Sequence, residues 1–111
     1  MTFVHTTIHV TDIDRSIAFY SRLGMEVDRR FPVHGHEIAF LGSGETKLEL
    51  ISDGKGAVDY PGISVGFVCR DAGALAKDLD EKCVGPISPG PGVEFWFVRD
   101  PDGFLVQIMK G

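Results

Sequence analysis

The amino-acid sequence predicts an α+β fold in which one order of elements, strand–helix–strand–strand–strand, occurs twice. Near the N-terminus, residues first alternate between two faces, as in a half-buried strand, and then apolar residues recur at helical spacing. From Ile63 onward the chain again passes from an alternating strand to a helix. Because the two halves share little sequence identity, the repeat is one of pattern.

The first strand and helix carry the clearest signals. The strand has Val4, Thr6, Ile8 and Val10 on one face and Phe3, His5, Thr7 and His9 on the other. A helix follows from Ile13, with Asp12 or Asp14 as its N-cap, and ends at Gly24. This helix is expected to cover the apolar face of the strand and to leave the histidine-bearing face open.

The rest of the first half contains three further strands and a linker. The strands are predicted at Met25–Phe31, closed by Pro32, at Glu37–Leu41 and at Thr46–Ile51, with turns at 33–36 and 42–45. Residues 52–62 are rich in Gly and Asp, which indicates a linker between the halves.

The second half repeats the pattern. A strand at 63–68 precedes a helix that Asp71 caps and that ends near Cys83–Gly85. Pro86 to Gly92 is expected to be a loop because it is rich in Pro and Gly. Strands at 93–98 and 104–109 are joined by a type I turn at 99–103 that ends in Gly.

Length and composition favour one soluble domain, residues 1–111, built from pseudo-repeats at about 1–52 and 62–111. A cytoplasmic protein is expected, because no apolar run could cross a bilayer and the N-terminus lacks a signal peptide. The net charge of −5 argues against a nucleic-acid partner. Cys69 and Cys83 form no C-x-x-C pair and are expected to be reduced.

Four polar residues occupy matching positions in the two halves. The spacing from His5 to Ser64 nearly equals the spacing from Glu49 to Gln107. All four are therefore expected on one helix-free face of a curved sheet, which would form a concave, open surface for a ligand or a partner subunit. His5 and Glu49 are suitable donors for a divalent metal ion, although isolated His and Glu residues on strands are more often ordinary surface residues.

His9 lies on the same strand face as His5 and could take part in proton transfer or be an exposed strand residue. The segment Asp100–Gly103 lacks the later ligands of a calcium loop, and turn chemistry explains it. No phosphate-binding loop, nucleophile elbow or dinucleotide fingerprint is present.

Several motifs together resemble the vicinal oxygen chelate superfamily, and glyoxalase I-like proteins in particular. The matching segments are His5-Thr6 with Val10-x-Asp12, Ser16-Ile17-Ala18-Phe19-Tyr20 with Leu23-Gly24, Leu48-Glu49-Leu50, and Phe97-Val98-x-Asp100-Pro101-Asp102-Gly103-Phe104. The resemblance implies two paired βαβββ modules, a curved mixed sheet with an open concave face, and often a homodimer. It also implies a divalent metal ion, such as zinc, nickel, manganese or iron, and isomerisation of the hemithioacetal of methylglyoxal and glutathione.

The resemblance also assigns roles to residues of this chain. His5, Glu49 and Gln107 would bind the metal, and Glu49 or His9 would be the catalytic base. Ser64 stands where the family has a ligand His, Gln107 where it has a Glu that is also the base, and His9 where glyoxalase I commonly has an Arg that binds glutathione.

Two functions follow from this comparison. One is a glyoxalase I-like metal-dependent lyase or isomerase that acts on a small oxygenated substrate. The alternative is a metal-free protein that sequesters a small molecule, like the bleomycin-resistance branch of the family. The negative net charge would suit a cationic ligand of such a protein.

Overall fold

The computed structural model describes residues 1–55 and 62–111. The chain divides into two compact units, Met1–Val58 (unit 1) and Asp59–Gly111 (unit 2), which are described separately here. Most of the linker predicted at 52–62 lies outside the described residues. The expectation that the two halves form a single domain stays a prediction.

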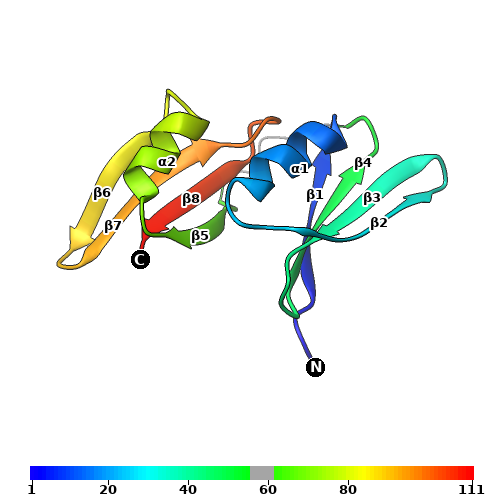
Figure 1. The fold of residues 1–111 in the computed structure, drawn as a ribbon, viewed down its shortest axis with the longest axis horizontal. Helices are drawn as coiled ribbons and strands as arrows, with labels where there is room; N and C mark the ends of the chain where they lie inside the picture. Colours follow the sequence, from blue (N-terminus) through cyan, green and yellow to red (C-terminus); the bar gives the residue numbers. More distant parts are fainter. Residues whose placement is uncertain (56–61) are drawn as a thin grey trace. The chain divides into compact units, whose positions relative to one another are not determined.

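Unit 1 is a four-stranded mixed sheet with one helix (Figure 1). Its elements are β1 (His5–Val10), α1 (Ile13–Ser21), β2 (Val27–Val33), β3 (His36–Leu41) and β4 (Lys47–Ser52). The strand order is β1-β4-β3-β2. β1 pairs in parallel with β4, and the other pairs are antiparallel.

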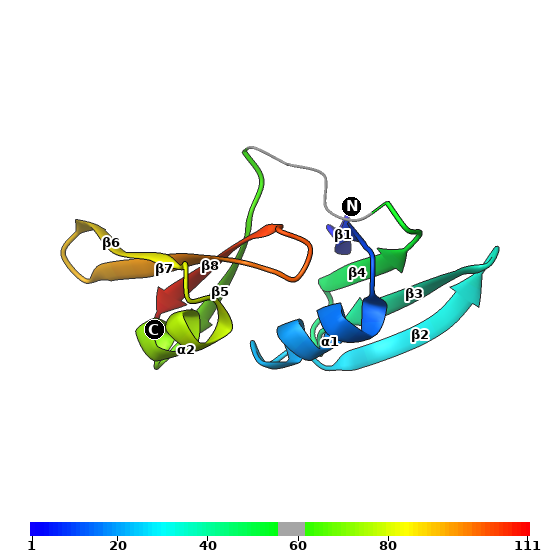
Figure 2. The ribbon, with the colours of Figure 1, turned by 90° about the horizontal axis from the view of Figure 1, so that it is seen from above.

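The helix α1 forms where the predicted cap and apolar stripe coincide. The side chain of Asp12 accepts a hydrogen bond from the backbone N–H of Arg15 at 3.1 Å, so Asp12 and not Asp14 is the N-cap. Ile13, Phe19 and Tyr20 are buried. α1 lies along one face of the sheet and contacts β3 and β4 (Figure 2).

Alternation along the strands separates the two faces of this sheet. The core face carries six side chains that are each at most 4% exposed: Ile8, Val10, Ala39, Leu41, Leu48 and Leu50. The intervening residues of β1 and β4 lie on the opposite face, which α1 leaves open. The period-2 pattern therefore predicts the orientation of β1 and β4 correctly.

The prediction that Pro32 closes its strand is wrong. β2 continues to Val33, and Pro32 pairs with Glu37 of β3. Because β2 is an edge strand, the missing N–H of proline need not cost a ladder hydrogen bond. The turn shortens to His34 and Gly35, whose φ angles of 48° and 80° suit a two-residue hairpin.

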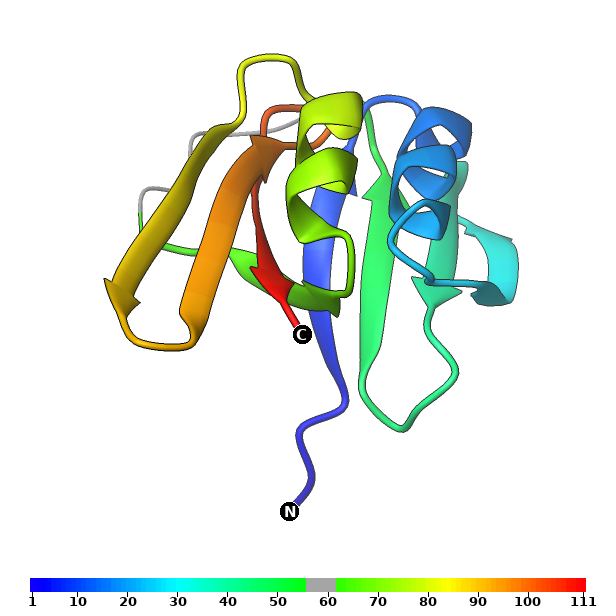
Figure 3. The same cartoon turned by 60° about the vertical axis from the view of Figure 1, so that its left-hand side comes forward.

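Unit 2 repeats this topology, which confirms the predicted α+β class and the βαβββ order in both units. Its elements are β5 (Val65–Cys69), α2 (Ala72–Leu79), β6 (Val84–Gly90), β7 (Val93–Arg99) and β8 (Leu105–Lys110). The strand order is β5-β8-β7-β6, with β5 parallel to β8. Figure 3 shows β6, β7 and β8 side by side.

Two boundaries in unit 2 differ from the prediction. The segment from Pro86 to Gly92, expected to be a loop, contributes most of β6, an edge strand whose pairing with β7 is irregular. At such an edge, prolines interrupt few hydrogen bonds. The helix α2 ends at Leu79 instead of near Cys83–Gly85, and Asp71 occupies its N-cap position without a capping side-chain hydrogen bond.

The indole ring of Trp96 fills the space between α2 and β6. Trp96 is 6% exposed, and a Cβ atom built on Gly73 of α2 would lie 2.8 Å from its Cζ2 atom. A Cβ atom on Gly85 of β6 would lie 2.7 Å from its Cδ1 atom. The indole ring therefore packs against the backbone of α2 at Gly73 and of β6 at Gly85. This close contact is possible only because glycine has no side chain.

The predicted turn before β8 is confirmed. The backbone N–H of Gly103 donates to the carbonyl of Asp100 at 2.9 Å, and Gly103 has a φ of 91°. Cys69 and Cys83 are both free thiols. Neither helix of the described part of the chain has the length and apolar character that crossing a membrane requires.

Candidate functional site

The open face of unit 1 gathers the polar residues of β1 and β4. The parallel register places Thr7 opposite Glu49, and the antiparallel register places Phe40 of β3 on the other side of Glu49. His5 and His9 flank Thr7 on the same face of β1. The predicted site residues of the first half therefore lie on one face.

His5 and Glu49 are in contact. The Nε2 atom of His5 lies 3.4 Å from Oε1 of Glu49, and the side chains are 37% and 13% exposed. The Oγ1 hydroxyl of Thr7 donates to the same Oε1 atom at 2.5 Å. The pair that the sequence predicts is thus formed, and Thr7 helps to orient the carboxylate of Glu49.

His9 pairs with a residue that the sequence analysis missed. Its Nδ1 atom lies 2.6 Å from Oδ2 of Asp53, and the backbone N–H of Lys55 donates to Oδ1 of Asp53 at 3.1 Å. Burial by itself would raise the pKa of Asp53, but the hydrogen bonds from Lys55 and His9 outweigh it. The pKa of Asp53 therefore lies below its ordinary value.

An aromatic and cationic group borders this site. The ring of Phe40 contacts the imidazole of His5 edge-on, with ring centroids 5.5 Å apart. The guanidinium carbon of Arg29 lies 4.5 Å from the centroid of Phe40. This stack places a positive charge on the far side of Phe40 from Glu49.

The predicted residues of the second half lie in unit 2. Gln107, on β8, is half-buried and pairs with Gly66 of β5, so both lie on the sheet face opposite α2. A Cβ atom on Gly66 would lie 3.6 Å from Oε1 of Gln107. Ser64 is exposed and directly precedes β5. That Gln107 and Ser64 join His5 and Glu49 in one cluster stays a prediction.

The chemistry of the His5–Glu49 pair suits a divalent metal ion. Two ligands bound at about 2.0–2.2 Å in tetrahedral geometry would lie about 3.4 Å from each other, and the observed separation of Nε2 and Oε1 is 3.4 Å. Within residues 1–55 and 62–111, no group of three or more His, Cys, Asp or Glu side chains could hold such an ion. These two donors fit a metal, and the remaining ligands would have to be of other kinds.

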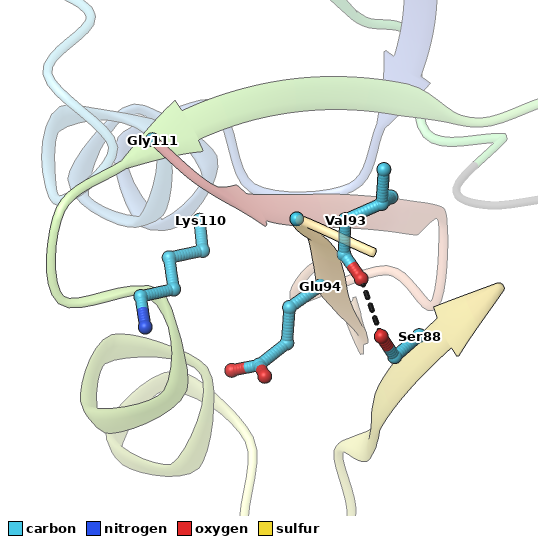
Figure 4. A pocket seen from close by; sticks show the side chains of 6 residues that line it. Ser88, Val93, Glu94, Lys110 and Gly111 are labelled. Carbon is cyan, nitrogen blue, oxygen red and sulfur yellow. Dashed lines mark hydrogen bonds between the residues drawn. The ribbon is translucent and has the colours of Figure 1, made fainter. Parts of the chain in front are cut away.

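A separate hollow lies in unit 2 and contains none of the predicted site residues (Figure 4). Its volume is about 330 Å³, and its lining residues are Ser88, Gly92, Val93, Glu94, Lys110 and Gly111. The Ser88 hydroxyl donates to the carbonyl oxygen of Val93 at 2.7 Å. His5, Glu49, His9, Ser64 and Gln107 therefore all lie outside this hollow.

Comparison with known sequences gives a consistent result. The family model of the Glyoxalase/Bleomycin resistance protein/Dioxygenase superfamily matches residues 2–108. The lactoylglutathione lyase of Haemophilus influenzae is 32% identical, over 99% of this chain and 93% of its relative. The probable lactoylglutathione lyase of Vibrio cholerae is 28% identical, over 96% of this chain and 88% of the relative.

Solved structures agree with the sequence comparison. The trypanothione-dependent glyoxalase I of Leishmania major matches with a TM-score of 0.78 and 30% identity, covering 99% of this chain and 86% of the other. Glyoxalase I from Zea mays has a TM-score of 0.74 at 24% identity, covering 98% of this chain and 44% of the maize chain. The maize match supports the fold alone.

Proposed function

Because the chain belongs to the Glyoxalase/Bleomycin resistance protein/Dioxygenase superfamily, we propose that this glyoxalase I-like protein is a metal-dependent lyase or isomerase of a small oxygenated substrate. The observation that carries this proposal is the contact between His5 Nε2 and Glu49 Oε1 at 3.4 Å. Its curated relatives include proteins named lactoylglutathione lyase.

His5 and Glu49 would hold the metal, and Gln107 would contribute an amide oxygen, as the family resemblance implies. A divalent ion such as zinc, nickel, manganese or iron would act there as a Lewis acid that polarises the substrate oxygens. Thr7, which donates to Oε1 of Glu49, would keep the carboxylate in its ligating orientation.

The protein's own groups must move the proton. In the reaction that the family resemblance implies, a hemithioacetal is isomerised by transfer of a proton between adjacent carbons. Gln107 cannot accept this proton because an amide is not a base at neutral pH. Glu49 and His9 are therefore the candidate bases, and both lie on the open face of unit 1.

The substrate is proposed to differ from that of the named relatives. His9 stands where glyoxalase I commonly has a glutathione-binding Arg, and its ring contacts the carboxylate of Asp53. A carboxylate beside this position disfavours an anionic group of a ligand. We therefore expect a small oxygenated substrate that carries no carboxylate at this end.

The second candidate function is metal-free binding of a small molecule. It is favoured by the neutral residues Ser64 and Gln107 at two of the four positions where the family has ligands. For either function, the family resemblance supports a homodimer, and a cytoplasmic location remains the proposal from the sequence pattern. Sedimentation of the purified chain would test the homodimer.

Metal content distinguishes the two functions. The chain, purified without a histidine tag or added metal, would be measured by mass spectrometry, before and after reconstitution, as wild type, Glu49→Ala and Glu45→Ala. Glu45 is exposed in the loop between β3 and β4 and serves as the matched control. We expect about one metal per chain, lost only in Glu49→Ala, because Glu49 supplies the charged ligand.

Absence of metal from the wild type after reconstitution would refute the metal-dependent proposal. Binding of a small molecule that is unaffected by chelators would then support the second candidate. Equal loss of metal in both variants would mean that net charge, and not Glu49, controls metal content.

A further inference from the structure

The second histidine–carboxylate pair of unit 1 has the geometry of a fixed dyad. His9 Nδ1 and Asp53 Oδ2 lie 2.6 Å apart, which is short for a nitrogen–oxygen hydrogen bond. The side chain of Asp53 is 9% exposed, and that of His9 is 35% exposed. The carboxylate is thus enclosed, while part of the imidazole ring is open to solvent.

Both oxygens of Asp53 are engaged. Oδ2 contacts His9, and Oδ1 accepts the backbone N–H of Lys55 at 3.1 Å in the turn that follows β4. A backbone N–H group of this turn therefore helps to hold the carboxylate in place. These contacts also favour the ionised form of Asp53.

An ionised carboxylate only accepts hydrogen bonds, so the short contact places a proton on Nδ1 of His9. In the neutral imidazole, the basic lone pair then lies on Nε2. Within the described residues, Nε2 of His9 has no hydrogen-bond partner. His9 projects from the same face of β1 as His5.

We propose that Asp53 is a positioning residue that fixes the tautomer and ring orientation of His9, so that Nε2 serves as the general base of the reaction. This inference rests on the proposed function and deepens it, because it chooses His9 over Glu49 as the base. Nε2 would take the proton from the substrate carbon and return it to the adjacent carbon. No oxidant or further reactant is needed, since substrate and product are isomers.

The charged groups nearest His9 in the fold come from β4 and from the turn that follows it. From β4 and its following turn, Asp53 and Glu49 carry negative charges, and Lys55 carries a positive one. On β1, His5 lies on the same face as His9. On β3, Ile38 and Phe40, which pair with Ile51 and Glu49 of β4, are uncharged. Asp53 is the carboxylate in contact with His9, so its removal is the sharpest perturbation of the dyad.

The test compares the wild type with Asp53→Asn, and uses Glu45→Gln as a control that removes one exposed negative charge from the same unit. In the metal-free protein, ¹⁵N NMR of the imidazole nitrogens reports the tautomer of His9, which a His9→Gln variant identifies among the four histidines. We expect the Nδ1-protonated tautomer in the wild type and in Glu45→Gln. In Asp53→Asn the population shifts toward Nε2-protonated imidazole, because an amide can donate to Nδ1.

The kinetic measurement uses the metal-reconstituted protein with the hemithioacetal of methylglyoxal and 2-mercaptoethanol, which carries no carboxylate, as the probe. We expect Asp53→Asn to lower kcat by about 10²–10⁴-fold, the usual contribution of a general base, with little change in KM. Glu45→Gln keeps the wild-type kcat. The acidic limb of the kcat–pH profile, where kcat falls as the general base becomes protonated, should also change in Asp53→Asn, and a merely structural role would leave it unmoved.

A wild type with Nε2-protonated His9, or an Asp53→Asn variant with full kcat, overturns the inference. The two proposals fail separately. A wild type that binds metal but is inactive on the probe counts against the proposed function, whereas the NMR result still decides whether Asp53 fixes the tautomer of His9.

Discussion

Replacement of Gly73 by Ala tests the packing of Trp96 in unit 2. The new Cβ atom would lie 2.8 Å from Cζ2 and 3.2 Å from Cη2 of the indole, well inside the contact distance of about 3.5–4.0 Å between carbon atoms. The ring is confined at a second place as well, because a Cβ position on Gly85 lies 2.7 Å from Cδ1.

Two effects of opposite sign determine the size of the change. Gly73 lies in the first turn of α2, and replacing Gly by Ala there gains at most about 0.5–1 kcal/mol, the gain in a helix interior. Forcing an extra methyl group into a packed core costs about 1–3 kcal/mol. Because the neighbour is a rigid ring that is 6% exposed, the steric cost should dominate. We expect the free energy of unfolding to fall by about 1–2 kcal/mol.

The assay is urea unfolding followed by fluorescence, since Trp96 is the single tryptophan of the chain and therefore reports on unit 2. Gly90→Ala is the control, because a Cβ atom there has no neighbour within 4 Å. A Gly73→Ala protein as stable as the wild type, or more stable, would refute the reasoning and show that helix propensity decides at this position.

Three further predictions have clear expected outcomes. Asp12→Ala should lower the free energy of unfolding by about 1 kcal/mol and Asp71→Ala by a few tenths of a kcal/mol, as urea unfolding would measure. The difference is expected because only Asp12 caps its helix through its side chain. Asp100→Ala should cost about 1–3 kcal/mol by the same assay, because Asp100 Oδ1 accepts two backbone N–H groups of its turn. The hydrogen bond from Arg30 holds the pKa of Glu37 below its ordinary value of 4.5, so stability should fall as the pH drops below about that value; thermal unfolding across pH should show a smaller fall in Arg30→Gln.

The alternation of residues predicted the part of the site that depends on one strand at a time. The face of His5 and His9 follows from the buried Ile8 and Val10 between and beyond them. The face of Glu49 follows in the same way from its apolar neighbours. Their contact additionally requires β1 to pair in parallel with β4, which the period of the sequence does not predict.

The sequence did not predict the partners that depend on register and on turn structure. Thr7 contacts Glu49 only because the parallel register places them opposite each other. Asp53 lies just beyond β4 in a segment whose Gly and Asp content indicated a linker, and its side chain turns back to His9. Asp is common in the turn after a strand, both where its side chain faces solvent and where it contacts a site. The residue type alone therefore does not distinguish the two cases.

Edge strands caused the errors in the fold. Pro32 and the prolines of β6 were interpreted as breakers, since proline cannot donate to a ladder. Both segments are outermost in their sheets, where one side of the strand has no partner in the unit. Position in the sheet, which is a tertiary property, decided whether proline was compatible with a strand.

The parallel pairing of β1 with β4 couples the binding of a ligand on the open face to the folding of unit 1. Its contacts join residues 42 to 44 positions apart, Thr7 with Glu49 and His9 with Asp53. Such contacts exist only after the two ends of unit 1 have met, and they are lost together when it unfolds. A molecule that binds them should therefore raise the unfolding free energy by about 2.7 kcal/mol at a hundredfold excess over its Kd. A change in melting temperature can thus identify a ligand before any reaction has been observed.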